Sequence, residues 1–165
     1  MIEFTVADAS AMDKLGVQLG HVLKSGAVVY LHGELGAGKT TLVRGVLHGL
    51  GFTGSVRSPT YTLVEGYEFS GRWLQHLDLY RICAPAELEY LGIRELDDPD
   101  LWVFVEWPER GETALPRPDL ILILEAQEPG RRIRLEAQSA RGQTLAEAWR
   151  GAMQAAREPG LVLAG

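Results

Sequence analysis

Two short apolar runs give the strongest secondary-structure signals in the chain. Residues 27–32 read AVVYLH and residues 101–107 read LWVFVEW. Uninterrupted apolar runs of this length, rich in β-branched and aromatic residues, are typical of strands that are buried on both faces, as in parallel sheets. We therefore expect these two runs to be central strands of a covered sheet.

Other apolar runs predict the remaining strands. Ser70-Gly71 is a hairpin signal, because it lies between two runs of strand type, and it predicts that residues 61–69 and 73–79 are antiparallel neighbours. Further strands are expected at residues 4–6, 119–126 and 131–138.

Apolar positions at helical spacing predict four helices. One begins at Ser10, with Asp13 completing a variant capping box, and ends at Gly26. The others cover residues 39–50, 84–92 and 144–157. The sequence contains no internal repeat and no low-complexity linker, so we expect these elements to form a single domain over residues 1–165. The tail from about residue 158 is expected to be loose.

Composition narrows the class of protein. The chain of 165 residues carries a net charge of −6, which argues against a bulk electrostatic footprint for nucleic acid. No apolar run approaches the length of a membrane span, and the first residues lack the pattern of a secretory signal. Cys83 is the single cysteine, so an internal disulfide is excluded. Together these features favour a cytoplasmic setting.

The glycine-rich stretch after the first apolar run carries the main functional signal. Residues 33–40, GELGAGKT, fit the phosphate-binding pattern G-x-x-x-x-G-K-[ST] at every fixed position. Glycines let backbone N–H groups surround phosphate oxygens, Lys39 adds a positive charge, and the Thr40 hydroxyl is placed to ligate Mg²⁺. The alternative is a glycine-rich turn without a ligand. The predicted strand before the stretch and the helix after it favour phosphate binding.

Two acids follow predicted strands and are candidates for the same site. Glu106 lies at the carboxyl end of the second apolar run, and parallel sheets bind their ligands at that edge. Asp78 lies at the end of the return strand of the hairpin. A nucleotide site needs an acid to manage metal and water, so we expect Glu106, and secondarily Asp78, to serve it.

Five segments, in this order, resemble one known family: GELGAGKTTLVRG, SPTYTLVEGY, HLDLYR, ELEYLGIRE and VEWPERG. The family is TsaE, the bacterial ATPase family of tRNA threonylcarbamoyladenosine (t6A) biosynthesis. The resemblance covers about residues 33–111, roughly half of the chain. It implies an α/β fold: a three-layer domain similar to P-loop NTPases, with a mostly parallel central sheet to which the predicted antiparallel hairpin is added. It also implies ATP and Mg²⁺ as cofactors, with the metal held by Thr40 and Glu106.

The resemblance also implies roles for individual residues. Thr60, in SPTYT, would sense the γ-phosphate as part of a switch segment, and Asp78 matches a family acid near the site. Lys39, Asp78, Glu106 and Thr60 are thus the expected catalytic residues. The resemblance implies a basic residue near the nucleotide at Arg131 or Arg132, and we assign Arg131. The expected nucleotide-binding residues are Glu34, Leu35, Gly36, Ala37, Gly38, Lys39, Thr40, Thr41 and Arg131.

The family works with a two-protein transferase complex of the TsaB and TsaD type, so contact with tRNA is expected to be indirect and no membrane is involved. The ATPase resets that complex between rounds and does not form the product bond. No arginine finger stands out within the motifs. We therefore expect hydrolysis to be slow alone and activated by partners. Two alternatives stay open: a small-molecule kinase, and a nucleotide-gated adaptor without required catalysis.

Overall fold

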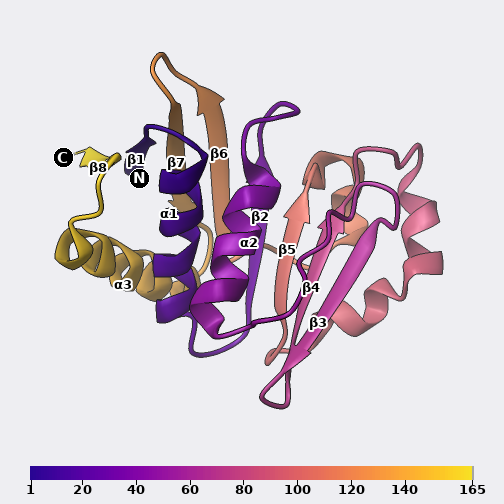
Figure 1. The fold of residues 1–165 in the computed structure, drawn as a ribbon. Helices are drawn as coiled ribbons and strands as arrows, with labels where there is room; N and C mark the ends of the chain where they lie inside the picture. Colours follow the sequence, from indigo (N-terminus) through magenta and orange to yellow (C-terminus); the bar gives the residue numbers. More distant parts are fainter. Residues whose placement is uncertain (165) are drawn as a thin grey trace.

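The computed structural model of the protein describes residues 1–164, without the side chains of Ile93, Arg94 and Glu112. The strands of this part of the chain form one sheet of eight, in the order β3-β4-β5-β2-β6-β7-β1-β8 (Figure 1). The strands are β1 (Ile2–Val6), β2 (Ala27–His32), β3 (Val64–Phe69), β4 (Arg72–Asp78), β5 (Trp102–Glu106), β6 (Leu120–Ala126), β7 (Arg131–Ala137) and β8 (Leu161–Ala164).

The centre of the sheet is parallel and its two sides are antiparallel. β4, β5, β2 and β6 run parallel to one another, as the two apolar runs predict. β3 pairs antiparallel with β4 through the predicted hairpin. On the other side, β6–β7, β7–β1 and β1–β8 are antiparallel as well, so antiparallel pairing extends well beyond the hairpin. The prediction of an α/β fold with a parallel core is confirmed.

The helices α1 (Ala9–Val22), α2 (Lys39–Leu50) and α3 (Ala140–Ala156) contribute to one hydrophobic core on one face of the sheet. Trp149 of α3 shows this arrangement, because its ring lies 5.0 Å from that of Phe4 on β1 and its indole N–H donates to Leu15 O of α1. The opposite face of β2, β4 and β5 contributes to a second core, together with 3-10 turns at Pro85–Leu91, Ile93–Asp97 and Glu112–Ala114. A further 3-10 turn covers Pro108–Arg110. The third layer of the expected three-layer domain is therefore built of 3-10 turns.

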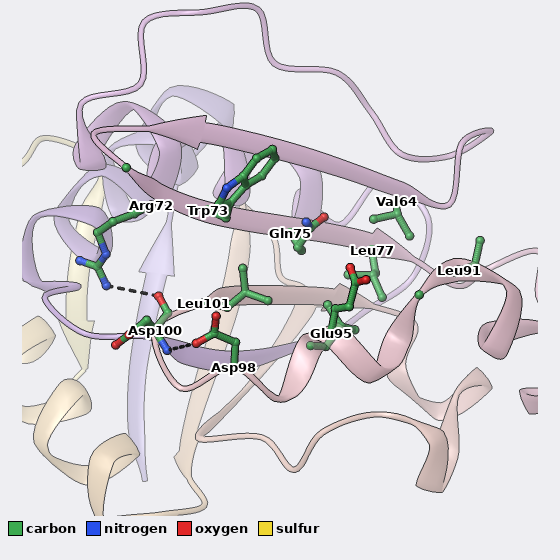
Figure 2. Close-up of a pocket in the computed structure, with 13 residues that line it drawn as sticks. Val64, Arg72, Trp73, Gln75, Leu77, Leu91, Glu95, Asp98, Asp100 and Leu101 are labelled. Carbon is green, nitrogen blue, oxygen red and sulfur yellow. Dashed lines mark hydrogen bonds between the residues drawn. The ribbon is translucent and has the colours of Figure 1, made fainter.

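A groove of about 410 Å³ opens on this second face, between β4 and the 3-10 turns (Figure 2). Trp73, Leu77 and Leu101 contribute to its wall. Arg72 closes one end, stacking on the Trp102 ring at 3.7 Å. No residue of the glycine-rich loop lines this groove, so the groove is separate from the expected nucleotide site.

Glycines bring α1 and α2 into direct backbone contact. A Cβ added at Gly16 would lie 2.2 Å from Leu42 O, and one at Gly45 would lie 2.1 Å from Asp13 O. Real Cβ atoms do not approach backbone this closely, so only glycine fits at these positions. The contact fixes α2, and with it the glycine-rich loop at its beginning, against the rest of the helical layer.

Several element ends differ from the sequence predictions for local reasons. α1 is capped by Asp8, whose carboxylate accepts the Ala11 N–H at 2.8 Å, so the helix begins before Ser10. α3 is capped by Ser139 in the same way and begins four residues before the predicted start. β3 begins only at Val64, because Leu63 has a φ of +66° and its N–H donates to Pro59 O in a turn.

The end of the chain also differs from its prediction. Residues 161–164 belong to the tail that was expected to be loose, yet they form β8 and pair antiparallel with residues 3–6 of β1. Glu158, at the start of this tail, lies 3.2 Å from the Lys14 ammonium of α1. Edge pairing with β1 satisfies backbone groups that an apolar tail cannot satisfy by itself. In residues 1–164 no helix combines the length and apolar character needed to cross a bilayer.

Candidate functional site

The glycine-rich loop connects β2 to α2 and has the backbone conformation that the motif requires. Gly36 and Gly38 have φ values of +78° and +104°, which are left-handed and favour glycine. Gly38 caps α2 without any side-chain hydrogen bond. Among the described residues, the Ala37 N–H is the only amide of residues 34–38 with a backbone acceptor, Glu34 O at 3.1 Å. The loop therefore offers N–H groups to an anion together with the positive end of the helix dipole.

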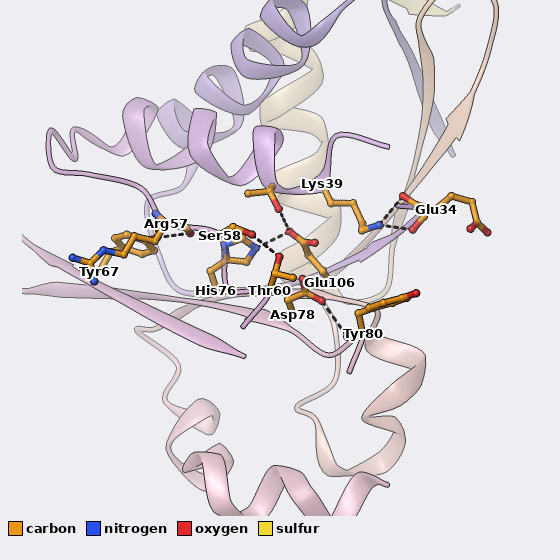
Figure 3. Close-up of polar contacts among 12 residues, drawn as sticks. Glu34, Lys39, Arg57, Ser58, Thr60, Tyr67, His76, Asp78, Tyr80 and Glu106 are labelled. Carbon is orange, nitrogen blue, oxygen red and sulfur yellow. Dashed lines mark hydrogen bonds and ion pairs between the residues drawn. The ribbon is translucent and has the colours of Figure 1, made fainter. Parts of the chain in front are cut away.

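Lys39 lies at the beginning of α2, buried beneath this loop. Its ammonium donates to the carbonyls of Gly33 and Glu34, the latter at 3.0 Å (Figure 3). It also lies 4.6 Å from the centre of the Trp107 ring. Burial lowers the pKa of Lys39 below its usual value, although the carboxylates of Glu106 and Asp78 oppose this effect. The site thus holds a desolvated cation that an anion would compensate.

The parallel register of β4 and β5 brings the two predicted acids together. Asp78 is the direct neighbour of Glu106 across the strands, and both are the last residues of their strands. Their side chains are 6% and 4% exposed. Burial raises the pKa of Asp78; the Tyr80 N–H, which donates to Asp78 Oδ1 at 3.1 Å, opposes the rise, and the charge of Glu106 adds to it. The carboxyl edge of the sheet therefore holds two close, buried carboxyl groups.

Thr40 and Glu106, the predicted metal ligands, are in direct contact. The Thr40 hydroxyl donates to Glu106 Oε1 at 2.8 Å, so both lone pairs of the hydroxyl oxygen stay available to a cation. Hard oxygen donors of this kind suit Mg²⁺, which takes only one or two protein ligands at nucleotide sites and completes its shell with phosphate oxygens and water. Within the described residues, no group of three or more His, Cys, Asp or Glu side chains is arranged to hold a metal ion.

Arg131 and the loop border a cavity of about 300 Å³ on the β6 side. The Arg131 guanidinium donates to Gly36 O at 3.4 Å, so the predicted basic residue does lie at the loop. Ile123, Leu124 and Ala126 form an apolar wall. Leu35 and Gly36 are exposed at the rim, whereas Ala37 is buried. The cavity therefore combines an apolar wall with a cation beside the glycine-rich loop, a lining typical of small-molecule sites.

Thr60 lies in the turn that precedes β3. Its hydroxyl hydrogen-bonds with that of Ser58 at 2.7 Å, and within the described part of the chain no hydrogen bond joins it to Lys39 or Glu106. The segment of residues 57–63, which contains Thr60, is anchored at both ends. The Tyr67 hydroxyl accepts the Arg57 N–H at 2.9 Å and donates to Arg57 O at 3.0 Å, and Leu63 O accepts the Asp78 N–H at 2.9 Å. A γ-phosphate-sensing role for Thr60 stays a prediction.

Sequence reasoning missed His76. Its ring is fully buried, and Nε2 lies 2.9 Å from Glu106 Oε1. The histidines of the chain carry no metal-ligand spacing, and for that reason none was assigned to the site. The available signal was position: His76 lies two residues before Asp78 on a strand, so the two side chains lie on the same face of the sheet.

Fold and site together define an α/β protein with a candidate anion site, built from loop amides, a buried lysine and two acids, at the carboxyl edge of parallel strands. Comparison with known proteins narrows this class. The family model for "Threonylcarbamoyl adenosine biosynthesis protein TsaE" matches residues 6–134. The chain belongs to the TsaE family.

Individual relatives support the assignment. The tRNA threonylcarbamoyladenosine biosynthesis protein TsaE of Haemophilus influenzae is 40% identical over 149 residues, which cover 87% of this chain and 94% of the relative. The protein of the same name from Bacillus subtilis is 39% identical, covering 75% of this chain and 78% of the relative. Among solved structures, Bacillus subtilis YdiB superposes with a TM-score of 0.75 at 26% identity, covering 92% of this chain and 97% of the other.

Proposed function

We propose that the chain is a Mg²⁺-dependent ATPase of the P-loop NTPase class that takes part in t6A synthesis on tRNA. It would act in the cytoplasm on a two-protein transferase complex of the TsaB and TsaD type, resetting it between rounds, with tRNA contacted only through those partners. The relatives named above, which carry t6A biosynthesis in their names, support the pathway. The arrangement of the glycine-rich loop, Lys39, Thr40 and Glu106 supports the proposed hydrolysis of ATP.

One observation carries the proposal. The glycine-rich loop, the buried Lys39 ammonium and the Thr40–Glu106 pair converge at the end of β5, next to Asp78. Phosphoryl transfer to water needs positioned charge more than covalent chemistry, and this arrangement supplies positive groups for phosphates and oxygen ligands for a metal. A glycine-rich turn without a ligand would give no reason to bury a lysine near two acids, because burying a charge is costly unless it is compensated.

Each group has a role that follows from its placement. Loop amides and Lys39 would bind and orient the β- and γ-phosphates, and Mg²⁺, when bound through Thr40 and Glu106, would neutralise charge on them. Asp78, with its raised pKa, would orient the attacking water and take up its proton. The nucleoside would occupy the cavity beside Arg131.

No arginine is bonded to the acids of the site in the described residues. Arg81 instead lies over the Tyr61 ring, 4.6 Å from its centre, and Tyr61 is an exposed residue inside the segment of residues 57–63. A missing transition-state cation makes slow hydrolysis by the isolated chain the expected behaviour, because such a cation contributes about 10³–10⁵-fold in related nucleotide hydrolases. Partner docking would supply or reposition it.

Phosphate release from Mg·ATP by the purified chain, alone and with the two partner proteins, tests the proposal. We expect slow release alone and a clear increase with partners, whereas equal rates would contradict activation. Glu106→Gln should lower release by about 10²-fold while nucleotide still binds. Labelled ATP offered together with small-molecule acceptors covers the kinase alternative, which predicts transfer to an acceptor and little release to water.

The anchoring of residues 57–63 also favours an adaptor role. Tyr67 holds one end and the Asp78 N–H holds the other, while Tyr61 between them is 82% exposed. A nucleotide could order this segment for docking without any need for turnover. Glu106→Gln separates the two functions: t6A formation at the full rate would favour the adaptor, and loss of t6A formation despite retained docking would favour the ATPase.

A further inference from the structure

His76 has no role in the functions discussed above, although it contacts the acid at the centre of the site. It lies on β4 with no exposed surface, and its side chain shares the face of the sheet on which Asp78 and Glu106 lie. Histidine is seldom fully buried without a reason, because its ring carries two polar nitrogens that need partners.

The contact with Glu106 defines the tautomer of the ring. A carboxylate can only accept, so the Nε2 that lies 2.9 Å from Glu106 Oε1 carries the hydrogen. The other ring nitrogen, Nδ1, is then a bare acceptor, and it is buried with no hydrogen-bond partner among the residues that the structure describes. A buried polar atom without a partner costs about 1–3 kcal/mol. Packing alone would be served better by an apolar residue, so the Nε2–Glu106 bond is the contact that explains a histidine here.

That bond restricts the metal-binding carboxylate. Glu106 Oε1 accepts from both His76 Nε2 and the Thr40 hydroxyl, at 2.9 and 2.8 Å (Figure 3). Two donors on one oxygen fix the plane of the carboxylate. Among the described residues no donor lies on the second oxygen, Oε2, which is left for a cation or its water. The same arrangement aims the Thr40 hydrogen at Glu106 and keeps the hydroxyl lone pairs free.

We propose that His76 is a positioning residue for the cation site: it holds the Glu106 carboxylate in the orientation that Mg²⁺ requires. The proposal rests on the function proposed above. Without the Nε2 donor, Glu106 can rotate and the Thr40 hydroxyl loses its fixed acceptor, so Mg²⁺ binding should weaken. Nucleotide binding through the loop and Lys39, which His76 does not contact, should persist.

Mg²⁺ titrations of a fluorescent ATP analogue bound to the chain test the inference. In His76→Leu we expect the Mg²⁺ concentration for half-maximal effect to rise about 10-fold or more, with unchanged analogue affinity in the presence of a chelator. His76→Gln keeps an N–H donor near the position of Nε2 and should recover most of the Mg²⁺ response. Hydrolysis by His76→Leu should be rescued in part by excess Mg²⁺, which a purely structural role does not predict.

Leu74→Ala is the matched control, because Leu74 is fully buried two residues away on the same face of β4. It should lower the melting temperature without moving the Mg²⁺ midpoint.

A second readout uses the metal-free protein: nitrogen-detected NMR of the His76 imidazole should show the Nε2–H tautomer.

The outcomes separate the two proposals. A wild-type chain whose analogue binding ignores Mg²⁺ would overturn the proposed function, and with it this inference. A normal wild-type response that His76→Leu leaves within two-fold, or shares with Leu74→Ala, would overturn the role of His76 alone. The Nδ1–H tautomer in the metal-free protein would overturn it too.

Discussion

Two buried aspartates lie at opposite edges of the parallel strands, and their surroundings differ sharply. Asp119, just before β6, is 5% exposed and accepts from Val28 N–H, Ser139 Oγ and Arg141 Nη2 at 2.8, 2.6 and 2.7 Å. Burial would raise the pKa of Asp119, but the hydrogen bonds from Arg141, Ser139 and Val28 together hold it below its usual value. This acid ties β2, β6 and the beginning of α3 together.

Asp78 is equally buried at the carboxyl edge but has a single described donor, the Tyr80 N–H. Its pKa is raised mainly by burial, and Glu106 next to it adds to the rise. The chain thus satisfies an acid that serves the architecture and leaves underpaired an acid that faces the candidate nucleotide site. Groups with perturbed pKa values in a cleft mark functional sites more often than structural ones, and this difference separates the two edges of the sheet.

Removing the cation at the carboxyl edge should have the largest effect on function. Lys39→Ala deletes the buried ammonium next to both acids, so we expect nucleotide affinity and hydrolysis to fall, the latter by about 10³-fold. Fluorescent-nucleotide binding and phosphate release measure both. Lys24→Ala, at an exposed position after α1, is the control and should behave as wild type. Unchanged nucleotide binding in Lys39→Ala would remove the basis for the site.

Asp78→Asn should have opposite effects on function and on stability. Hydrolysis should fall about 10²-fold because the variant lacks the carboxylate that we propose orients the attacking water. A raised folded-state pKa stabilises the native state while the group is protonated, and this contribution is lost as pH rises from the ordinary value of 3.8 through the folded value. The variant should therefore gain stability relative to wild type as pH rises above about 4. Urea unfolding between pH 4 and pH 8 checks the slope, and a constant difference would contradict it.

Asp119→Asn should show the reverse pattern. Removing the charge from a carboxylate held by Arg141, Ser139 and Val28 should cost about 2 kcal/mol of unfolding free energy at pH 7, with hydrolysis per folded molecule unchanged. A lowered folded-state pKa contributes stability above the ordinary value of 3.8, and this contribution is lost as pH falls through the folded value. The difference between wild type and variant should therefore shrink on acidification below about pH 4. If Asp119→Asn lost activity without losing stability, Asp119 would serve the function and not the architecture, contrary to this comparison.

An exposed pair on the antiparallel side should matter least. Glu3 lies 3.3 Å from Arg132, and their side chains are 33% and 45% exposed. Solvent and salt screen such pairs, so Glu3→Gln should change the unfolding free energy by less than about 0.5 kcal/mol and leave hydrolysis unaltered. A thermal melt at low and high salt measures this. A larger effect would mean that the Glu3–Arg132 pair contributes to the stability of the fold or to the function of the site, despite its exposure.

Local patterns predicted much of this arrangement and failed at identifiable places. The two apolar runs, the hairpin at Ser70-Gly71 and the helix after the glycine-rich loop are where the sequence placed them. Helix starts were misplaced because Asp8 and Ser139 act as caps that lie outside the apolar periodicity. The tail was misread since its pairing partner, β1, lies at the other end of the chain.

The sequence by itself determined the glycine-rich loop, its lysine and threonine, and the acids that end two strands, because each of these signals is local or repeats along one strand. Only the tertiary structure decided which donors bond to each buried carboxylate. Glu106 accepts hydrogen bonds from Thr40 and His76, Asp119 accepts from three donors, and Asp78 accepts from one. These groups come from separate elements, and only the register of a parallel sheet brings them within hydrogen-bonding distance. Burial then gives each contact its energetic weight, because a desolvated charge depends strongly on the few partners that it has.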